Sequence, residues 1–105
     1  MKPDVRLSKS AAKKLGKLFD FLEKEWSIKV KKEFIKKLEK SLLQIQKLPD
    51  CCPESEKIIG LRKCVVTRQT TIFYKYSDKV IYIITIFDNR QNPKSLKNDY
   101  ENTNI

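Results

Sequence analysis

The sequence predicts an α+β fold in which a small, mostly antiparallel sheet is covered on one face by a helical hairpin. Apolar residues recur at helical spacing in the first half of the chain, whereas β-branched and aromatic residues collect between residues 60 and 93. A loop containing prolines separates these two regions. The chain has 105 residues, enough for one domain with a modest core. We therefore expect the order β-α-α-β-β-β in a single domain over residues 1–95, followed by a polar tail over residues 96–105.

A short strand and two helices are predicted in the N-terminal half. Residues 4–7 read as extended, and Ser8 or Ser10 can cap the next helix because a serine hydroxyl accepts from a free N–H of the first turn. A first helix is expected over residues 9–25. Ser27 can cap a second helix, which Pro49 ends because proline cannot continue it. The turn between the helices is short, so they are expected to pack as an antiparallel hairpin.

Three further strands are predicted after a loop over residues 49–60. The runs cover residues 61–66, 70–76 and 79–87. The last run, VIYIITIF, is almost continuously apolar, which indicates a central strand buried on both faces. In the first run, alternation places Arg62 and Cys64 on one face of the sheet and Lys63 on the other. The helices would cover one face and leave the other partly open to a ligand or partner.

The charge of the chain favours an anionic partner. It has 23 Lys and Arg residues against 13 Asp and Glu residues, a net charge of +10. Such an excess on a small domain is typical of proteins that bind nucleic acid or an acidic protein, with plain solubility of lysine-rich helices as the alternative. No apolar run approaches the roughly 20 residues that span a bilayer. No signal segment is recognised, so we expect a cytoplasmic location and no membrane partner.

The cysteines and the lack of histidine restrict the chemistry. Cys51, Cys52 and Cys64 are odd in number and include two neighbours, so they do not indicate a disulfide framework and fit a reducing compartment. Without histidine or a CxxC motif, a zinc site is not expected, and no cofactor is predicted. Catalytic groups of the Ser-His-Asp or Cys-His type are excluded.

The candidate functional residues lie mainly at strand ends. Arginine binds two phosphate oxygens at once, so Arg62 and Arg90 would form a small anion site if they shared the open face. For Arg90 the alternative is an ion pair with Asp88. Tyrosines of the strands could stack on bases, or could be half-buried sheet residues. The set expected to bind a target or a partner protein is Arg62, Lys63, Arg68, Lys75, Asp88, Asn89 and Arg90.

Several stretches together resemble a known family. These are FLEKEWSIKVKKEFIKKLEKSL, GLRKCVV, TTIFYKYSDKVIYIITIF and the terminal FDNRQNP. In this order they resemble the RelE/ParE superfamily of toxins from type II toxin–antitoxin (plasmid stabilisation) modules, over residues 4–95. The resemblance implies an antiparallel-rich sheet backed by two helices, growth arrest, and a hetero-oligomer with a cognate acidic antitoxin on the open sheet face. RelE-like members cut mRNA in the ribosome, and ParE-like members poison DNA gyrase.

The residues expected of a RelE-like ribonuclease are incomplete. Arg62 and Arg90 match two of its basic positions and are catalytic candidates only in that case. Cys64 stands where a strand lysine is expected, and Thr71 stands where an arginine is expected. Leu96 falls near the position of a tyrosine, which Tyr100 in the tail could replace.

We therefore predict a ParE-like toxin that acts on DNA gyrase. RNA cleavage by the 2′-hydroxyl needs a base and an acid, and a guanidinium does not readily give up a proton. One alternative is a RelE-like endonuclease of ribosome-bound mRNA, which would be a metal-independent enzyme. The other is a non-toxic basic module that binds nucleic acid or protein.

Overall fold

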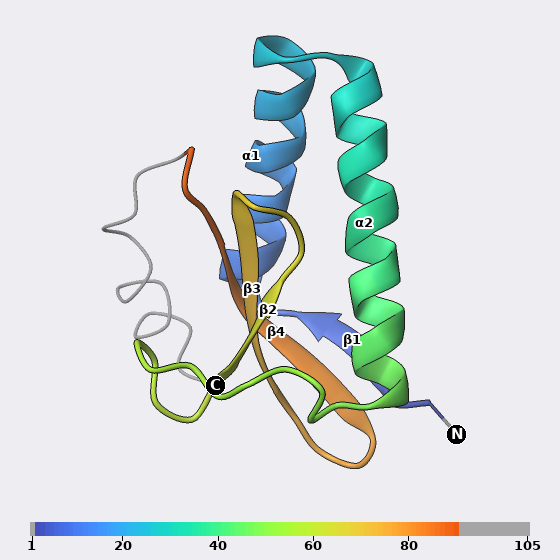
Figure 1. The fold of residues 1–105 in the computed structure, drawn as a ribbon, viewed down its shortest axis with the longest axis vertical. Helices are drawn as coiled ribbons and strands as arrows, with labels where there is room; N and C mark the ends of the chain where they lie inside the picture. Colours follow the sequence, from blue (N-terminus) through green and yellow to red (C-terminus); the bar gives the residue numbers. More distant parts are fainter. Residues whose placement is uncertain (1, 91–105) are drawn as a thin grey trace.

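The computed structural model describes residues 2–90 and has the predicted order of elements. Strand β1 (Asp4–Leu7) is followed by helices α1 (Lys9–Glu25) and α2 (Ile28–Lys47). Strands β2 (Arg62–Val65), β3 (Thr70–Tyr76) and β4 (Val80–Asp88) follow. The sheet has the order β1-β4-β3-β2, with β1 parallel to β4 and the other pairs antiparallel. The predicted α+β class and its mostly antiparallel sheet are confirmed (Figure 1).

Two serines fix the starts of the helices. The Ser8 hydroxyl accepts from the N–H of Ala11 at 2.9 Å and donates to the carbonyl of Ile84 at 2.6 Å. Ser8 therefore caps α1 and also ties its first turn to β4, whereas Ser10 lies inside the helix. Ser27 caps α2 by accepting from the N–H of Val30 at 3.1 Å.

The helical hairpin packs on one face of the sheet. Figure 1 shows α1 and α2 antiparallel and side by side, with the strands against them. The core between helices and sheet is a cluster of buried residues: Ala11, Leu18, Leu22, Phe34, Leu38, Ile45, Cys64, Ile72, Tyr74, Ile81, Ile83 and Ile86. Burial of these side chains is what stabilises two helices that carry many lysines on their outer surfaces.

Strand β4 is the centre of the sheet, as its apolar sequence indicates. It pairs with β1 on one side and β3 on the other, and most of its side chains are buried. The β3–β4 register shifts between Phe73 and Tyr74, where a bulge places an additional residue in β4. A hydroxyl near this bulge, Thr85 Oγ1, is buried with no hydrogen-bond partner among residues 2–90.

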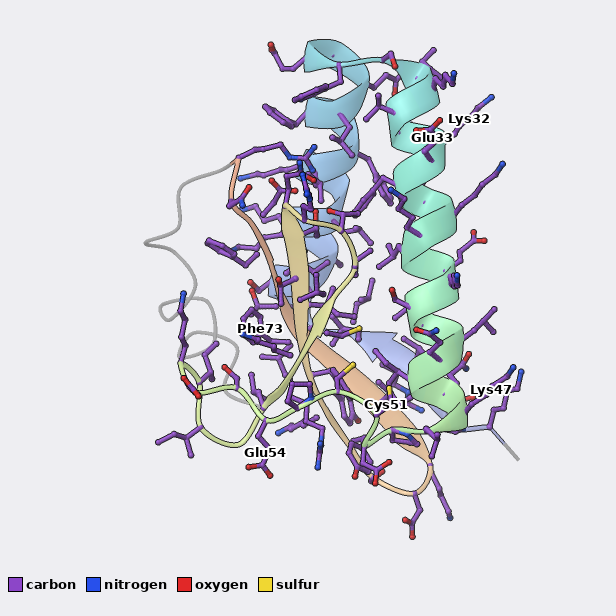
Figure 2. All side chains as sticks on the ribbon, in the orientation of Figure 1. Lys32, Glu33, Lys47, Cys51, Glu54 and Phe73 are labelled. Carbon is purple, nitrogen blue, oxygen red and sulfur yellow. The ribbon has the colours of Figure 1, made fainter. Side chains whose placement is uncertain are left out.

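The second face of the sheet is less open than we expected. Ile58 and Leu61, from the end of the α2–β2 loop, are buried against Phe73 and Ile84 in a second, smaller core. Figure 2 shows Phe73 pointing away from α2, toward this face. The loop therefore covers part of the surface that the helices leave free. In the described residues, no helix is both long and apolar enough to cross a bilayer.

Candidate functional site

Arg90 is held at the end of β4 by Asp88. Its Nε donates to Asp88 Oδ1 at 2.8 Å, and Nη2 donates to Asp88 Oδ2 at 2.5 Å. The Arg90 backbone N–H donates to the same Oδ1 at 2.9 Å, and the Thr70 hydroxyl donates to Oδ2 at 2.7 Å. Asp88 is only 2% exposed, so its charge is balanced almost entirely by these donors.

These contacts set the ionisation of both side chains. Burial by itself raises the pKa of Asp88, but hydrogen bonds from the Arg90 side chain, the Thr70 hydroxyl and the Arg90 backbone lower it overall below the ordinary aspartate value. The hydrogen bond to Asp88 raises the pKa of Arg90. The pair is therefore ionised throughout the neutral range, which makes Arg90 a fixed cation.

The surroundings of Arg90 come from the helical hairpin and the β2–β3 turn. Its guanidinium carbon lies 5.9 Å from the centre of the Trp26 ring, at the end of α1. A hollow of about 100 Å³ beside it is lined by Leu22, Val30, Glu33, Phe34, Lys37, Thr67, Gln69 and Arg90. This volume holds only a few water molecules, so the site suits contact with a protein surface or a single small group better than a nucleotide.

Arg62 fastens the loop that follows α2. Its Nη1 donates to the carbonyl of Cys52 at 2.6 Å and to the carbonyl of Asp50 at 3.3 Å. Its guanidinium carbon also lies 5.8 Å from the centre of the Tyr76 ring. Half-buried and bonded to two backbone carbonyls, Arg62 has a bracing role in the described structure.

The two arginines do not form the shared anion site that we considered. Arg62 pairs with Tyr74 on β3, whereas Asp88, which holds Arg90, pairs with Thr70 at the other end of that strand. Arg62 also shares its face of β2 with the buried Cys64, so it lies on the helix side of the sheet and not on the opposite face. The two guanidinium groups are separated because each one bonds to acceptors near its own end of β3, and the spacing of residues in the sequence does not reveal these acceptors.

The remaining predicted site residues divide between the same two ends. Arg68 is exposed in the β2–β3 turn, and the backbone N–H of the exposed Asn89 donates to the carbonyl of Gln69 at 2.8 Å, so both lie near Arg90. Lys63 is exposed on β2, and Lys75 lies on β3 opposite Tyr82. The candidate set therefore forms one group around Asp88 and another around β2.

The tyrosines are mainly structural. Tyr74 is fully buried, and its hydroxyl donates to the carbonyl of Pro49 at 2.7 Å. Burial, together with nearby Cys52, raises its pKa well above the ordinary tyrosine value. Tyr82 is half-buried, and Tyr76 is 41% exposed next to Arg62. The alternative of a half-buried sheet position holds for Tyr82, whereas Tyr74 is on the sheet but more deeply buried than expected.

The two described positions that differ from the ribonuclease pattern, Cys64 and Thr71, provide no cation that could bind RNA. Cys64 is 6% exposed in the main core, and Thr71 is half-buried on β3 opposite Val65. Leu96 and Tyr100 lie outside the described residues. In residues 2–90, no group of three or more His, Cys, Asp or Glu side chains is arranged to hold a metal ion.

Sequence reasoning missed a groove between the end of α2 and the outer edge of β2. This α2–β2 groove has a volume of about 570 Å³ and is lined by Gln44, Lys47, Leu48, Cys51, Cys52, Pro53, Lys63, Cys64 and Val65. Leu48 and Val65 are each 61% exposed. The sequence does not reveal this exposure, because it depends on the path of the irregular loop that closes the groove.

Comparisons with known proteins agree with this architecture. Residues 5–93 match the model of the family described as the ParE toxin of the type II toxin–antitoxin system parDE. No curated protein sequence matches the chain significantly. Among solved structures, the chain is similar to one described as the chromosomal ParDE toxin–antitoxin system from P. aeruginosa, with a TM-score of 0.69 and 13% identity. That alignment covers 83% of this chain and 96% of the other.

Two further solved structures share the fold. The E. coli DinJ–YafQ toxin–antitoxin complex gives a TM-score of 0.57 at 14% identity, covering 86% of this chain and 96% of that one. YafQ from E. coli strain BL21(DE3) gives 0.54 at 18% identity, covering 85% and 96%. At these identities the likeness concerns the fold, whereas the family match extends over most of the sequence. The chain thus belongs to the ParE toxin family of type II toxin–antitoxin systems.

Proposed function

We propose that this toxin arrests growth by binding its target, DNA gyrase, and not by cutting RNA. The observation that carries the proposal is the engagement of both candidate catalytic arginines. Arg90 is ion-paired with Asp88, and Arg62 is bonded to two loop carbonyls. Neither guanidinium is directed at a common point where a phosphate could be attacked, because the two lie at opposite ends of β3.

The chemistry of RNA cleavage supports the same choice. Attack by the 2′-hydroxyl needs a base, a cation for the phosphorane and an acid for the leaving oxygen. Guanidinium is a poor base and a poor acid at neutral pH. The Tyr74 hydroxyl is already bonded to Pro49, and its raised pKa makes it a poorer acid than an ordinary tyrosine.

The target is tested by inducing the protein in cells that carry a DNA-damage reporter. Gyrase poisoning predicts induction of the reporter before protein synthesis falls. With purified gyrase and relaxed plasmid, the purified protein should inhibit supercoiling or trap cleaved DNA. Rapid loss of translation without a damage response would contradict the gyrase target, and no growth phenotype would favour the non-toxic binding module.

We further propose an acidic antitoxin segment as the partner of the α2–β2 groove. Leu48 and Val65 supply exposed apolar surface, and Lys47 and Lys63 supply positive charge beside it. This combination fits a segment with apolar anchors and carboxylates. The second sheet face, where we first expected the antitoxin, is partly covered by Ile58.

The edge of β2 adds backbone hydrogen-bonding groups to the groove. The N–H of Lys63 donates outward to the carbonyl of Pro53 at 2.9 Å, so the backbone of Val65, two residues on, also points outward. Val65 lies beyond the part of β2 that the loop covers. An extended segment could therefore pair with this edge as an additional strand.

Substitutions in the groove test the antitoxin site. Val65→Asp and Leu48→Asp should weaken binding of the antitoxin encoded beside this gene by at least about tenfold, the equivalent of roughly 1.4 kcal/mol. Ile59→Asp is the matched control, because Ile59 is 90% exposed and does not line the groove. Equal affinity of all three variants, measured by calorimetry, would rule out the groove.

A further inference from the structure

The three cysteines come together beside the end of α2, although Cys64 is distant in sequence from Cys51 and Cys52. Cys51 Sγ lies 3.7 Å from Cys52 Sγ, and Cys52 packs against the core cluster that contains Cys64. Figure 2 shows the sulfur atoms near one another next to the C-terminal end of α2. All three thiols are free and line the α2–β2 groove. The action on gyrase proposed above assigns no chemistry to these thiols.

A short backbone pairing brings the loop segment that follows Cys52 alongside the start of β2, which contains Cys64. Glu54 and Arg62 form an antiparallel bridge, with the N–H of Ser55 donating to the carbonyl of Leu61 at 2.7 Å. On the other side of the bridge, the N–H of Lys63 donates to the carbonyl of Pro53 at 2.9 Å. Cys52 and Cys64 are each two residues beyond this bridge, in opposite directions along the two segments.

The closeness of the two segments favours a disulfide between Cys52 and Cys64. Glu54 and Arg62 are a pair without mutual hydrogen bonds, the type in which opposite Cα atoms lie about 4.5 Å apart. The bridge is isolated and the chain bends at Cys52, so the ladder does not extend to Cys52 and Cys64; the two residues approach each other because Cys52 packs against the core cluster that contains Cys64. A disulfide between them needs Cα atoms about 4.4–6.8 Å apart. The vicinal pair Cys51–Cys52, by contrast, would close a strained ring.

We propose that Cys52 and Cys64 are a redox-modification site that forms a reversible disulfide on reaction with a low-molecular-weight disulfide such as oxidised glutathione. The Cys52 thiolate attacks one sulfur of the reagent and releases one glutathione thiol. The Cys64 thiolate then attacks the Cys52 sulfur of this mixed disulfide and releases the second. Two protein thiols are oxidised, one reagent disulfide is reduced to two thiols, and the two protons leave with the products.

The exposed Cys51 is the alternative first acceptor of glutathione. It is the most exposed of the three, and Cys52 is in contact to take over from it by exchange. Burial is the main reason why the pKa of each of the three thiols is raised. The thiolate fraction at neutral pH is therefore small. The reaction should therefore accelerate as pH rises from 7 to 9.

The disulfide would change the groove directly. Cys52 provides the carbonyl that binds Arg62, and Cys64 lies on β2, so the bond would fasten the α2–β2 loop to the sheet. A fixed loop would keep the groove in one shape and raise the melting temperature, because the bond limits the unfolded chain. Reduction by dithiothreitol should reverse both effects.

The experiment treats the folded, reduced protein with oxidised glutathione and maps its cysteines by peptide mass spectrometry. We expect a Cys52–Cys64 bond, one remaining free thiol at Cys51, and a higher melting temperature. Cys64→Ala should stop the reaction at a glutathione adduct. Cys51→Ser changes an exposed site and should leave the fold intact. This variant should still form the Cys52–Cys64 bond, but more slowly.

Three other outcomes would overturn the proposal. These are three free thiols after prolonged treatment, a Cys51–Cys52 bond, and a bond between two molecules. If Cys64→Ala does not fold, as shown by circular dichroism, the peptide map of the wild type and of Cys51→Ser decides the question by itself. The result does not depend on the toxin's target. The gyrase proposal can fail while the disulfide forms, and the disulfide can fail to form while gyrase is inhibited.

Discussion

Arg90 forms a two-point ion pair with Asp88, two residues before it, at the end of the central strand. The acceptor is almost fully buried, and the donor is 18% exposed at its side chain. The pair joins β4 to the β2–β3 region through Thr70 and to the helical hairpin through Trp26. It is therefore a structural junction as well as a functional candidate.

Removal of Arg90 should destabilise the fold, because it leaves the buried Asp88 without its ion-pair partner. In Arg90→Ala the Asp88 carboxylate remains buried without its main donor, and we expect a loss of about 3 kcal/mol in the free energy of unfolding. Arg90→Lys should recover only part of this loss, because an ammonium cannot make the two parallel hydrogen bonds. Urea unfolding followed by circular dichroism measures both. Equal stability of wild type and Arg90→Ala would show that the pair contributes nothing.

The same pair predicts a dependence of stability on acid pH. The folded-state pKa of Asp88 lies below its unfolded value, so the folded state binds fewer protons in this range. The contribution is complete above the unfolded pKa of about 3.9 and is lost as pH falls through the lower folded value. Asp88→Asn should be less stable at pH 7, and its stability should fall less between about pH 4 and pH 2. Parallel curves for the two proteins would contradict this reading.

Arg62 is predicted to hold the α2–β2 loop in place. Arg62→Ala removes two charge-assisted bonds to loop carbonyls and should lower the free energy of unfolding by about 1–2 kcal/mol. The loop between Asp50 and Ser55 should also be cut faster by a nonspecific protease. Arg68→Ala is the control, since Arg68 is exposed in a turn. The prediction fails if both variants are cut at the wild-type rate.

Ser8 is predicted to matter more than Ser10. Ser8→Ala removes the cap of α1 and the bond to the Ile84 carbonyl, at a cost of about 1–2 kcal/mol. Ser10→Ala is the matched control because Ser10 lies within the helix. Thermal unfolding should separate the two variants by several degrees. Identical melting temperatures would mean that the cap is dispensable.

The fold could be predicted because local signals and burial agree. Serine caps, helical periodicity and the apolar run of β4 each indicate the element that forms, and the predicted helix over residues 9–25 coincides with α1. The order of elements together with the family resemblance supplied the topology. The family match over residues 5–93 and the shared fold confirm that reading.

The site could be predicted only in part, because it depends on contacts that are distant in sequence. The pairing of Arg90 with Asp88 can be predicted from local sequence, because the two residues are only two positions apart. The bonds of Arg62 to Asp50 and Cys52 depend on the path of an irregular loop. The meeting of Cys52 and Cys64 depends on the same loop pairing with β2, and a sequence period does not encode such pairing.

The central claim, that the protein acts by binding and not by cutting RNA, is tested most directly by mapping mRNA 5′ ends after induction. We expect transcripts to remain intact while growth stops. Codon-phased cuts across translated transcripts, abolished in an Arg62→Ala variant that is still folded and expressed at the wild-type level, would contradict it and establish a ribosome-dependent endonuclease instead.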